Sequence, residues 1–380
     1  MEILLLSAYH APSHRRWVEG VAANLTDHSV KILSQPPRHF AWRSRGNSLF
    51  WAFDEKLAES RPDLIIATSM VDLAGLRGMV PHLTQIPTLL YFHENQFAYP
   101  NRGQRNDGNY GVTNLYSALA ADRVLFNSPY NRRSFLEGAR QFLSKMPDQI
   151  PAGVAQAVAA KSGVLPVPLA NSLADPYPSR PDEGPLRIVW NHRWEYDKAP
   201  ATFFSALERL EKRHDFRLVV MGQRFRKAPP VFARMQDRLA SRIDQWGYVE
   251  DRRDYLKWLE RSDLVVSTAL HEFQGLAVQE AVMRGCLPVL PDRLAYPDFF
   301  DDSCLYDSHP EDDEADADAL AAHLDRLLAD PKRTRELTRP DLSHLRWSVL
   351  AGDYEREITE LVCRHRPHRD NVACEELTTN

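Results

Sequence analysis

The chain has few cysteines, no basic excess and no long apolar run, and each absence excludes a class of protein. Its four cysteines form no C-x-x-C pair, so neither a disulfide scaffold nor a common zinc pattern is expected. The net charge of −5 argues against a general nucleic-acid-binding protein but leaves room for a local basic patch. No apolar run approaches the roughly 20 residues that cross a bilayer. We therefore expect a globular, cytoplasmic protein with no membrane segment.

Three motifs of common enzyme classes are also missing. The sequence contains no G-x-x-x-x-G-K-[ST], no G-x-G-x-x-G and no G-x-S-x-G. The first predicted strand is followed by Tyr9-His10-Ala11-Pro12-Ser13, which lacks the glycines of a dinucleotide-binding loop. P-loop, dinucleotide-dependent and α/β-hydrolase chemistries are therefore poorly supported.

Short apolar runs alternate with segments of helical spacing. The predicted strands are 2–7, 29–33, 63–68, 88–92 and 124–127, then 186–190, 216–221, 264–267 and 287–290. The predicted helices are 14–25, 48–60 and 109–121, then 200–213, 251–261, 275–284 and 320–328. This alternation predicts parallel sheets covered by helices on both faces, which bind ligands at the carboxyl ends of their strands.

The chain is too long for one ordinary core, and a proline-rich break at 164–187 suggests a linker and hinge. We expect an amino-terminal Rossmann-like domain over 1–170 that binds the acceptor. A second Rossmann-like domain over 185–345 would bind a nucleotide. A terminal helix within 346–366 is expected to pack back on the first domain, with a disordered tail over 367–380.

The strongest chemical signal is the segment 271–280, which follows a strand and opens a helix. Unpaired backbone N–H groups at a helix start can hold a diphosphate, and Gly275 permits close approach. Glu272 and Glu280 flank this position and could accept hydrogen bonds from different hydroxyls of one sugar nucleotide. The alternative interpretation is an amphipathic helix with surface glutamates.

Two cations follow the strand 186–190. Arg193 and Lys198 would project from its carboxyl end and could neutralise a leaving diphosphate. An ordinary charged surface loop is the alternative. A third segment, His93-Glu94-Asn95-Gln96, follows the strand 88–92, where a histidine could bind a sugar hydroxyl or move a proton.

A fourth segment, 38–45, is basic and aromatic. Its arginines could hold phosphates and its aromatic rings could stack on bases, although a solvated loop explains the charge equally well. Arg102, Arg105, Arg132 and Arg133 could extend this surface.

Together these segments resemble a known family. Glu272 to Glu280 matches the E-x7-E signature of retaining glycosyltransferases with the GT-B fold, an α/β fold of two Rossmann-like domains facing across a cleft. Arg193 and Lys198 match the phosphate-binding pair of that group. Over most of 1–305 the chain further resembles the tRNA-queuosine α-mannosyltransferase family, through the segments Ser13-His14, Trp42-Arg43-x-Arg45, 91–96 and 114–128.

The resemblance implies transfer of mannose from GDP-mannose to the cyclopentenediol of queuosine at the wobble position of tRNA-Asp, with retained configuration. It implies catalytic roles for four residues: His93, Arg193, Lys198 and Glu272. Donor binding would fall to Arg193, Lys198, Phe273, Gln274, Gly275, Leu276 and Glu280. Acceptor binding is expected from Ser13, His14, Trp42, Arg43, Arg45, Glu94, Asn95 and Gln96. Neither a metal nor another cofactor is expected, because cations and a helix dipole supply the positive field.

Two other functions stay open at this point. One is a retaining GT-B glycosyltransferase acting on a lipid, a glycan or a small molecule. The other is a catalytically idle sugar-nucleotide-binding scaffold, against which the complete Arg/Lys and Glu/Glu set argues. The segment 42–45 separates a tRNA acceptor from the other acceptors.

Overall fold

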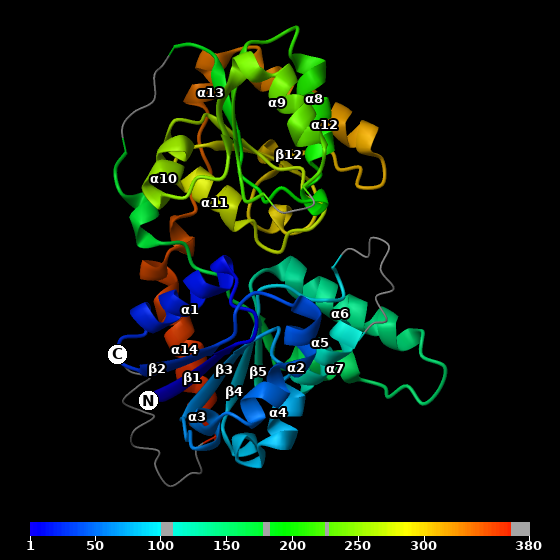
Figure 1. Cartoon of the computed structure of the whole chain (residues 1–380), viewed down its shortest axis with the longest axis vertical. Coiled ribbons are helices and arrows are strands. Elements are labelled where there is room, and N and C mark those ends of the chain that lie inside the picture. The colour runs from blue at the N-terminus through cyan, green and yellow to red at the C-terminus, as the bar shows by residue number, and fades with distance from the viewer. Residues whose placement is uncertain (100–108, 178–182, 225–227, 366–380) are drawn as a thin grey trace. The chain divides into compact units, whose positions relative to one another are not determined.

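The computed structural model describes residues 1–99, 109–177, 183–224 and 228–365. These residues form two compact units, each built on its own sheet (Figure 1). Unit 1 comprises Met1–Pro168 and the segment that begins at Trp347. Unit 2 comprises Leu169–Arg346. The candidate tail 367–380 lies outside the described residues.

Unit 1 contains a parallel sheet with the strand order β2-β1-β3-β4-β5-β6. Its strands are β1 (Glu2–Ser7), β2 (Ser29–Ser34), β3 (Leu64–Thr68), β4 (Thr88–Phe92), β5 (Arg123–Phe126) and β6 (Ser162–Val164). Its helices are α1 (Pro12–Asn24), α2 (Phe40–Ala52), α3 (Glu55–Ala58), α4 (Leu73–Met79), α5 (Asn109–Ala120), α6 (Pro129–Ser144), α7 (Val154–Ala160) and α14 (Trp347–His365), with the 3-10 turn η1 (Pro81–Gln85).

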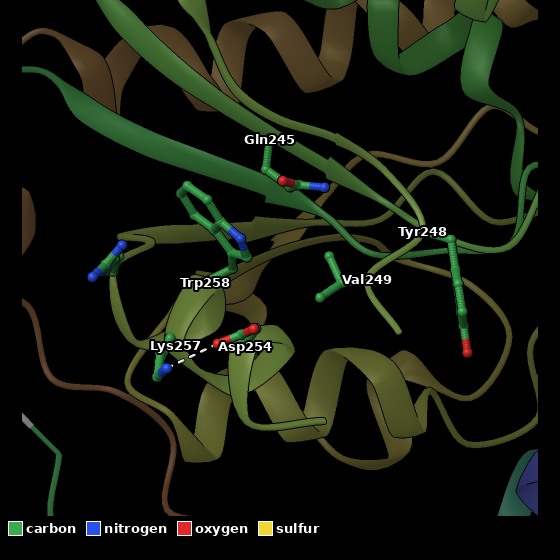
Figure 2. Close-up of a pocket in the computed structure, with 7 residues that line it drawn as sticks. Gln245, Tyr248, Val249, Asp254, Lys257 and Trp258 are labelled. Atoms are coloured by element: carbon green, nitrogen blue, oxygen red, sulfur yellow. Dashed lines mark hydrogen bonds and ion pairs between the residues drawn. The ribbon is translucent and has the colours of Figure 1, made fainter. Parts of the chain in front are cut away.

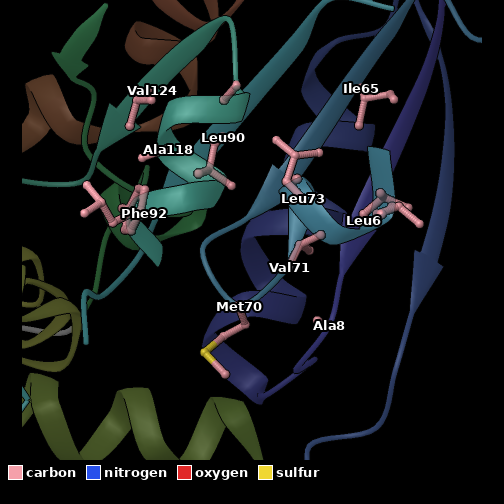
Figure 3. Packing of buried hydrophobic residues seen from close by; sticks show 14 of the residues in the cluster. Leu6, Ala8, Ile65, Met70, Val71, Leu73, Leu90, Phe92, Ala118 and Val124 are labelled. Atoms are coloured by element: carbon pink, nitrogen blue, oxygen red, sulfur yellow. The ribbon is translucent and has the colours of Figure 1, made fainter. Parts of the chain in front are cut away.

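The core of unit 1 is made by strand residues that point to one face of the sheet and by the helices that cover that face. Leu6, Ile65 and Leu90 come from three neighbouring strands and are fully buried. Figure 3 shows them against Leu73 of α4 and Ala118 of α5. Full burial on both faces explains why these strands read as continuous apolar runs in the sequence.

Helix α14 packs on the rest of unit 1, although it is the last element among the described residues. The indole N–H of Trp17 on α1 donates to the hydroxyl of Tyr354 at 2.9 Å. Arg123 forms a bidentate ion pair with Glu357, with both N–O distances at 2.7 Å. Polar groups buried at this contact are therefore satisfied across it, which fixes how the helix sits on the sheet.

Unit 2 contains a second parallel sheet, with the order β12-β11-β10-β7-β8-β9. Its strands are β7 (Leu186–Trp190), β8 (Phe216–Met221), β9 (Ile243–Gly247), β10 (Leu264–Val266), β11 (Leu287–Pro291) and β12 (Leu305–Tyr306). Its helices are α8 (Pro200–Leu210), α9 (Val231–Arg238), α10 (Arg252–Glu260), α11 (Leu276–Met283), α12 (Asp313–Leu328) and α13 (Pro331–Glu336). Short 3-10 turns are η2 (Asn171–Ala174), η3 (Tyr196–Lys198), η4 (Ala240–Arg242), η5 (Tyr296–Asp298), η6 (Asp302–Cys304) and η7 (Ser343–Leu345).

Two predictions from the sequence are wrong. The predicted helix 48–60 is instead the end of α2 followed by α3, because the side chain of Asp54 accepts from the backbone N–H of Lys56 and caps a new helix. The segment 38–45 is accordingly not a loop, since α2 already begins at Phe40. Cys286 and Cys304 are free and buried, whereas Cys363 is disulfide-bonded, which the cysteine spacing did not predict.

Candidate active site

The two strongest sequence signals lie in neighbouring loops of unit 2. Because β7 and β10 are adjacent and parallel, the segments that follow them leave the same edge of the sheet. The hydroxyl of Thr268 donates to the carbonyl of Lys198 at 2.8 Å, and the N–H of Leu270 donates to the carbonyl of Asp197 at 2.8 Å. These bonds join the two loops and fix the position of Lys198.

The ammonium group of Lys198 is buried in this junction. It donates to the backbone carbonyl of His271 and lies 3.4 Å from Oε2 of Glu272. It also lies 3.5 Å from Oδ2 of Asp197. Only 6% of the residue is exposed, so the positive charge is held where little water screens it.

Glu272 is a carboxylate over the whole range in which proteins usually work. Its burial alone would raise the pKa, but the charge of Lys198, the two neighbouring histidines and the backbone N–H of Gly275 lower the pKa to about 2. Burial and the Lys198 ammonium lower the pKa of His192 to about 3 and that of His271 to about 4. Neutral imidazoles therefore flank one cation and one anion.

The turn that opens α11 requires glycine. Gly275 has φ +83° at the helix N-cap, a region that residues with a side chain rarely adopt, and an added Cβ would lie 3.0 Å from the Tyr296 ring. Phe273 donates its N–H to Glu272 at 3.1 Å, and Gln274 pairs with Gln279 at 3.1 Å. Leu276 is the first residue of α11. The predicted donor-binding residues thus build one turn at a helix start.

Glu280 is buried on α11 and is paired with a residue that the sequence interpretation missed. Arg252, at the start of α10, contacts both carboxylate oxygens of Glu280, at 3.0 and 2.6 Å. The two residues are far apart in the sequence, so no local pattern predicted that they form a pair. Arg252 therefore holds in place the carboxylate predicted to bind ribose.

Arg193 lies at the open side of the same loop. Its guanidinium is 2.7 Å from Glu195 and 3.7 Å from Asp197, and 45% of the side chain is exposed.

Gly222, which follows β8, was also missed by the sequence interpretation. An added Cβ there would lie 1.8 Å from the carbonyl oxygen of His192, so only glycine lets the loop after β7 pass so close.

In unit 1, the predicted histidines form a buried pair at the carboxyl ends of β1 and β4. The rings of His14 and His93 have centroids 4.3 Å apart, and His93 also packs edge-on against Trp17 at 4.7 Å. Their ring nitrogens have no hydrogen-bond partner within the described part of the chain. Burial lowers the pKa of both groups, well below the usual value for His93. Two neutral imidazoles are thus available to hydroxyl groups.

The neighbouring acceptor candidates differ in their surroundings. The buried amide of Asn95 donates to Asn131 at 2.8 Å, and its oxygen accepts the N–H groups of Phe97 and Ala98. Asn95 therefore shapes the loop from inside. Gln96 is buried, Glu94 is half-buried and Ser13 is exposed on α1.

The third group of acceptor candidates lies on α2. Trp42 and Arg45 are exposed, and the Arg45 guanidinium lies 5.2 Å from the centre of the Tyr110 ring. Arg43 is half-buried and donates to Gln35 at 3.0 Å. The structure thus keeps these three residues in unit 1, together with the histidine pair.

A separate pocket of about 400 Å³ lies between β9 and α10 of unit 2 (Figure 2). Tyr248 and Trp258 line it, and Lys257 forms an ion pair with Asp254 at 2.8 Å. None of the predicted site residues lines it.

No group of three or more His, Cys, Asp or Glu side chains suited to a metal occurs among the described residues. In the same part of the chain, no helix is long and apolar enough to span a bilayer.

Comparison with known proteins decides the family. Residues 2–169 match the family described as tRNA-queuosine alpha-mannosyltransferase N-terminal, and residues 186–330 match glycosyl transferases group 1. A tRNA-queuosine alpha-mannosyltransferase of Drosophila melanogaster is 33% identical over 320 residues, which cover 80% of this chain and 83% of that protein. The chain belongs to the tRNA-queuosine alpha-mannosyltransferase family. The resemblance noted in the sequence is confirmed.

Solved structures confirm the fold. A sucrose-phosphate synthase from Thermosynechococcus elongatus has a TM-score of 0.70 at 16% identity, covering 96% of this chain and 100% of its own. A glycosyltransferase from Rickettsia africae has a TM-score of 0.65 at 16% identity, covering 95% and 98%. This member of the tRNA-queuosine alpha-mannosyltransferase family is therefore a GT-B hexosyltransferase with two Rossmann-like units.

Proposed function

We propose that this enzyme transfers mannose from GDP-mannose to the cyclopentenediol of queuosine at the wobble position of tRNA-Asp, with retained anomeric configuration. The main support for binding of the sugar-nucleotide donor is the buried ammonium of Lys198, which lies 3.4 Å from Glu272 at the turn that opens α11. Family membership supports the acceptor half.

The leaving group is an anion, and the donor site supplies positive charge for it. Lys198 and Arg193 would bind the diphosphate, with the N–H groups at the start of α11 adding the favourable end of a helix dipole. Preorganised charges of this kind stabilise the departing GDP as its bond to mannose breaks. The mechanism therefore assigns no step to a metal or another cofactor.

Glu272 and the histidine pair have complementary roles in this proposal. Because its pKa is about 2, Glu272 stays ionised and accepts hydrogen bonds from sugar hydroxyls instead of donating a proton. His93, neutral and buried, would contact the mannose on the acceptor side. Glu280, held by Arg252, would accept the ribose hydroxyls of the donor.

The reaction needs no protein nucleophile. The acceptor hydroxyl attacks the anomeric carbon on the face that the diphosphate leaves, and the departing phosphate oxygen takes the hydroxyl proton. The sugar–acceptor bond forms as the sugar–phosphate bond breaks, so GDP and mannosyl-queuosine are the products. Since tRNA is the acceptor, we place the enzyme in the cytoplasm.

Incorporation of labelled mannose tests this proposal. The enzyme is incubated with labelled GDP-mannose and with either queuosine-containing tRNA or the same tRNA lacking queuosine, with and without a chelator. We expect label only in queuosine-containing tRNA and no effect of the chelator. Equal label in both tRNAs, or transfer to a lipid or glycan alone, would overturn the acceptor assignment. Stabilisation against heating by UDP but not GDP would overturn the donor.

A further inference from the structure

Helix α2 presents an unusual surface for a protein with a net charge of −5. Large apolar side chains on it and just after it are exposed, namely Trp42 at 57%, Leu49 at 47%, Phe50 at 54% and Phe53 at 84%. Single exposed apolar residues are ordinary, but several on one helix indicate a contact surface. Trp42, Arg45 and Leu49 are spaced so that they share one side of α2.

The Trp42 ring lies against the helix itself. A Cβ added at Gly46, one turn further on, would come within 2.7 Å of the Trp42 ring carbons. Glycine inside a helix costs about 0.5–1 kcal/mol relative to alanine. Gly46 therefore weakens the helix but leaves room for the Trp42 ring. Gly46 thus lets the indole lie flat while more than half of Trp42 stays exposed.

The start of α2 is tied to the ligand-binding edge of the unit 1 sheet. Phe40 packs edge-on against Tyr9, which follows β1, with ring centroids 5.6 Å apart, and against Tyr110 at 5.5 Å. The Arg45 guanidinium lies over the Tyr110 ring, 5.2 Å from its centre. His93 leaves the same edge after β4. The start of α2 and His93 therefore lie at the same edge of one sheet.

The charge of this tract is opposite to that of the whole chain. No Asp or Glu occurs between Asp27 and Asp54, whereas Lys31, Arg38, Arg43 and Arg45 do. Such a tract complements a polyanion, and phosphate contacts from Lys and Arg supply most non-specific affinity for nucleic acids. An exposed aromatic ring among arginines is the arrangement on which unpaired bases stack.

We propose that Trp42, Arg45, Gly46 and Tyr110, here named the Trp42 platform, stack an unpaired base of the RNA acceptor beside its modified nucleotide. Trp42 contacts the base, Arg45 holds the neighbouring phosphate, and Gly46 is a positioning residue that keeps the indole flat. This inference rests on the proposed tRNA acceptor and adds how the enzyme holds it.

Binding of an anticodon stem-loop RNA, measured by filter binding at several salt concentrations, tests the platform. Trp42→Ala is expected to weaken binding about tenfold, while Trp42→Phe, which retains an aromatic face, stays within about threefold. Gly46→Ala should match Trp42→Ala although it removes no contact with RNA, because its methyl group displaces the ring.

Tyr248→Ala, which removes a ring that is 62% exposed on unit 2, is the matched control and should bind RNA as the wild type does. Unchanged RNA affinity in Trp42→Ala overturns the platform, even if the wild type transfers mannose to tRNA. The same holds if Trp42→Ala changes only the oligomeric state. Weakened RNA binding in a protein whose wild type transfers no mannose supports the platform and refutes the proposed reaction instead.

Discussion

Lys198 is a buried cation and Glu272 is its half-buried partner, so each charge is stabilised by the other. Lys198→Ala would leave the half-buried Glu272 carboxylate without its ammonium partner, so we expect a loss of about 1–3 kcal/mol in the free energy of unfolding. We also expect kcat to fall by about 10²–10³, because a preorganised charge at the leaving group is lost. Chemical denaturation and the transfer assay measure the two effects. Wild-type stability and turnover in Lys198→Ala would refute the role given to this pair.

The buried histidines of unit 2 make stability depend on pH. The pKa of His192 is lowered to about 3 and that of His271 to about 4, so between these values and about 6.5 the unfolded chain binds more protons than the folded one. The free energy of unfolding should therefore fall as pH drops below about 6.5, by up to about 1.4 kcal/mol per pH unit for each group. His192→Asn should flatten this slope in denaturation curves recorded across that range. An unchanged slope would contradict the assignment.

The buried histidine pair of unit 1 should lower the stability of the fold while contributing to mannosyl transfer. Buried polar atoms without partners cost about 1–3 kcal/mol each, so replacing His14 by Phe should leave the melting temperature unchanged or raise it. Mannosyl transfer should fall at the same time, because a hydroxyl-binding group is lost. His82→Asn is the control, since His82 is only half-buried and its ring pairs with Arg61. A destabilised His14→Phe protein would instead point to a purely structural ring.

At the scale of elements, alanine substitution should destabilise the fold at Gly275 and Gly222 but not at Gly352. Gly275→Ala would place a Cβ at φ +83° and 3.0 Å from Tyr296, and Gly222→Ala would overlap the His192 carbonyl. We expect both changes to destabilise unit 2 by more than about 1 kcal/mol and to weaken binding of GDP. Gly352→Ala on α14 meets nothing within 4 Å and should be stabilising by about 0.5–1 kcal/mol. Thermal unfolding with and without GDP ranks the three variants.

Buried strands and the turn before α11 could be predicted from sequence because local patterns encode them. The apolar runs at β1, β4, β7 and β8 have the observed bounds, since each strand is covered on both faces. The turn at Gly275 was found because glycine, two glutamates and a helical pattern occur together within ten residues.

Features that depend on distant or unusual neighbours could not be predicted. Strand β9 is at an edge and its residues are only half-buried, so it shows no apolar run. Helix α2 shows no clear apolar stripe because Trp42 and its exposed neighbours occupy the outer face. The Arg252–Glu280 pair joins two helices, and no local pattern marks it.

At the scale of the whole molecule, unit 1 includes helix α14, which follows unit 2 in the sequence. Trp347 packs over Gly20, where a Cβ would come within 2.5 Å of the indole, and Tyr354 receives the Trp17 N–H. A chain ending at Arg346 should therefore lose the cooperative unfolding of unit 1, while Leu169–Arg346 stays present in full. Hydrogen exchange measured by mass spectrometry distinguishes the two units. Equal protection of β1 and β4 with and without α14 would contradict this prediction.

Transfer of mannose to queuosine in tRNA is the reaction that we propose for the site around Lys198 and Glu272. It is tested most directly by incubating the wild type and Lys198→Ala with GDP-mannose and queuosine-containing tRNA, digesting the tRNA and weighing its nucleosides. We predict that the wild type adds the mass of one hexose to queuosine and that Lys198→Ala adds almost none. Queuosine of unchanged mass with the folded wild-type enzyme, or equal addition by Lys198→Ala, would contradict it.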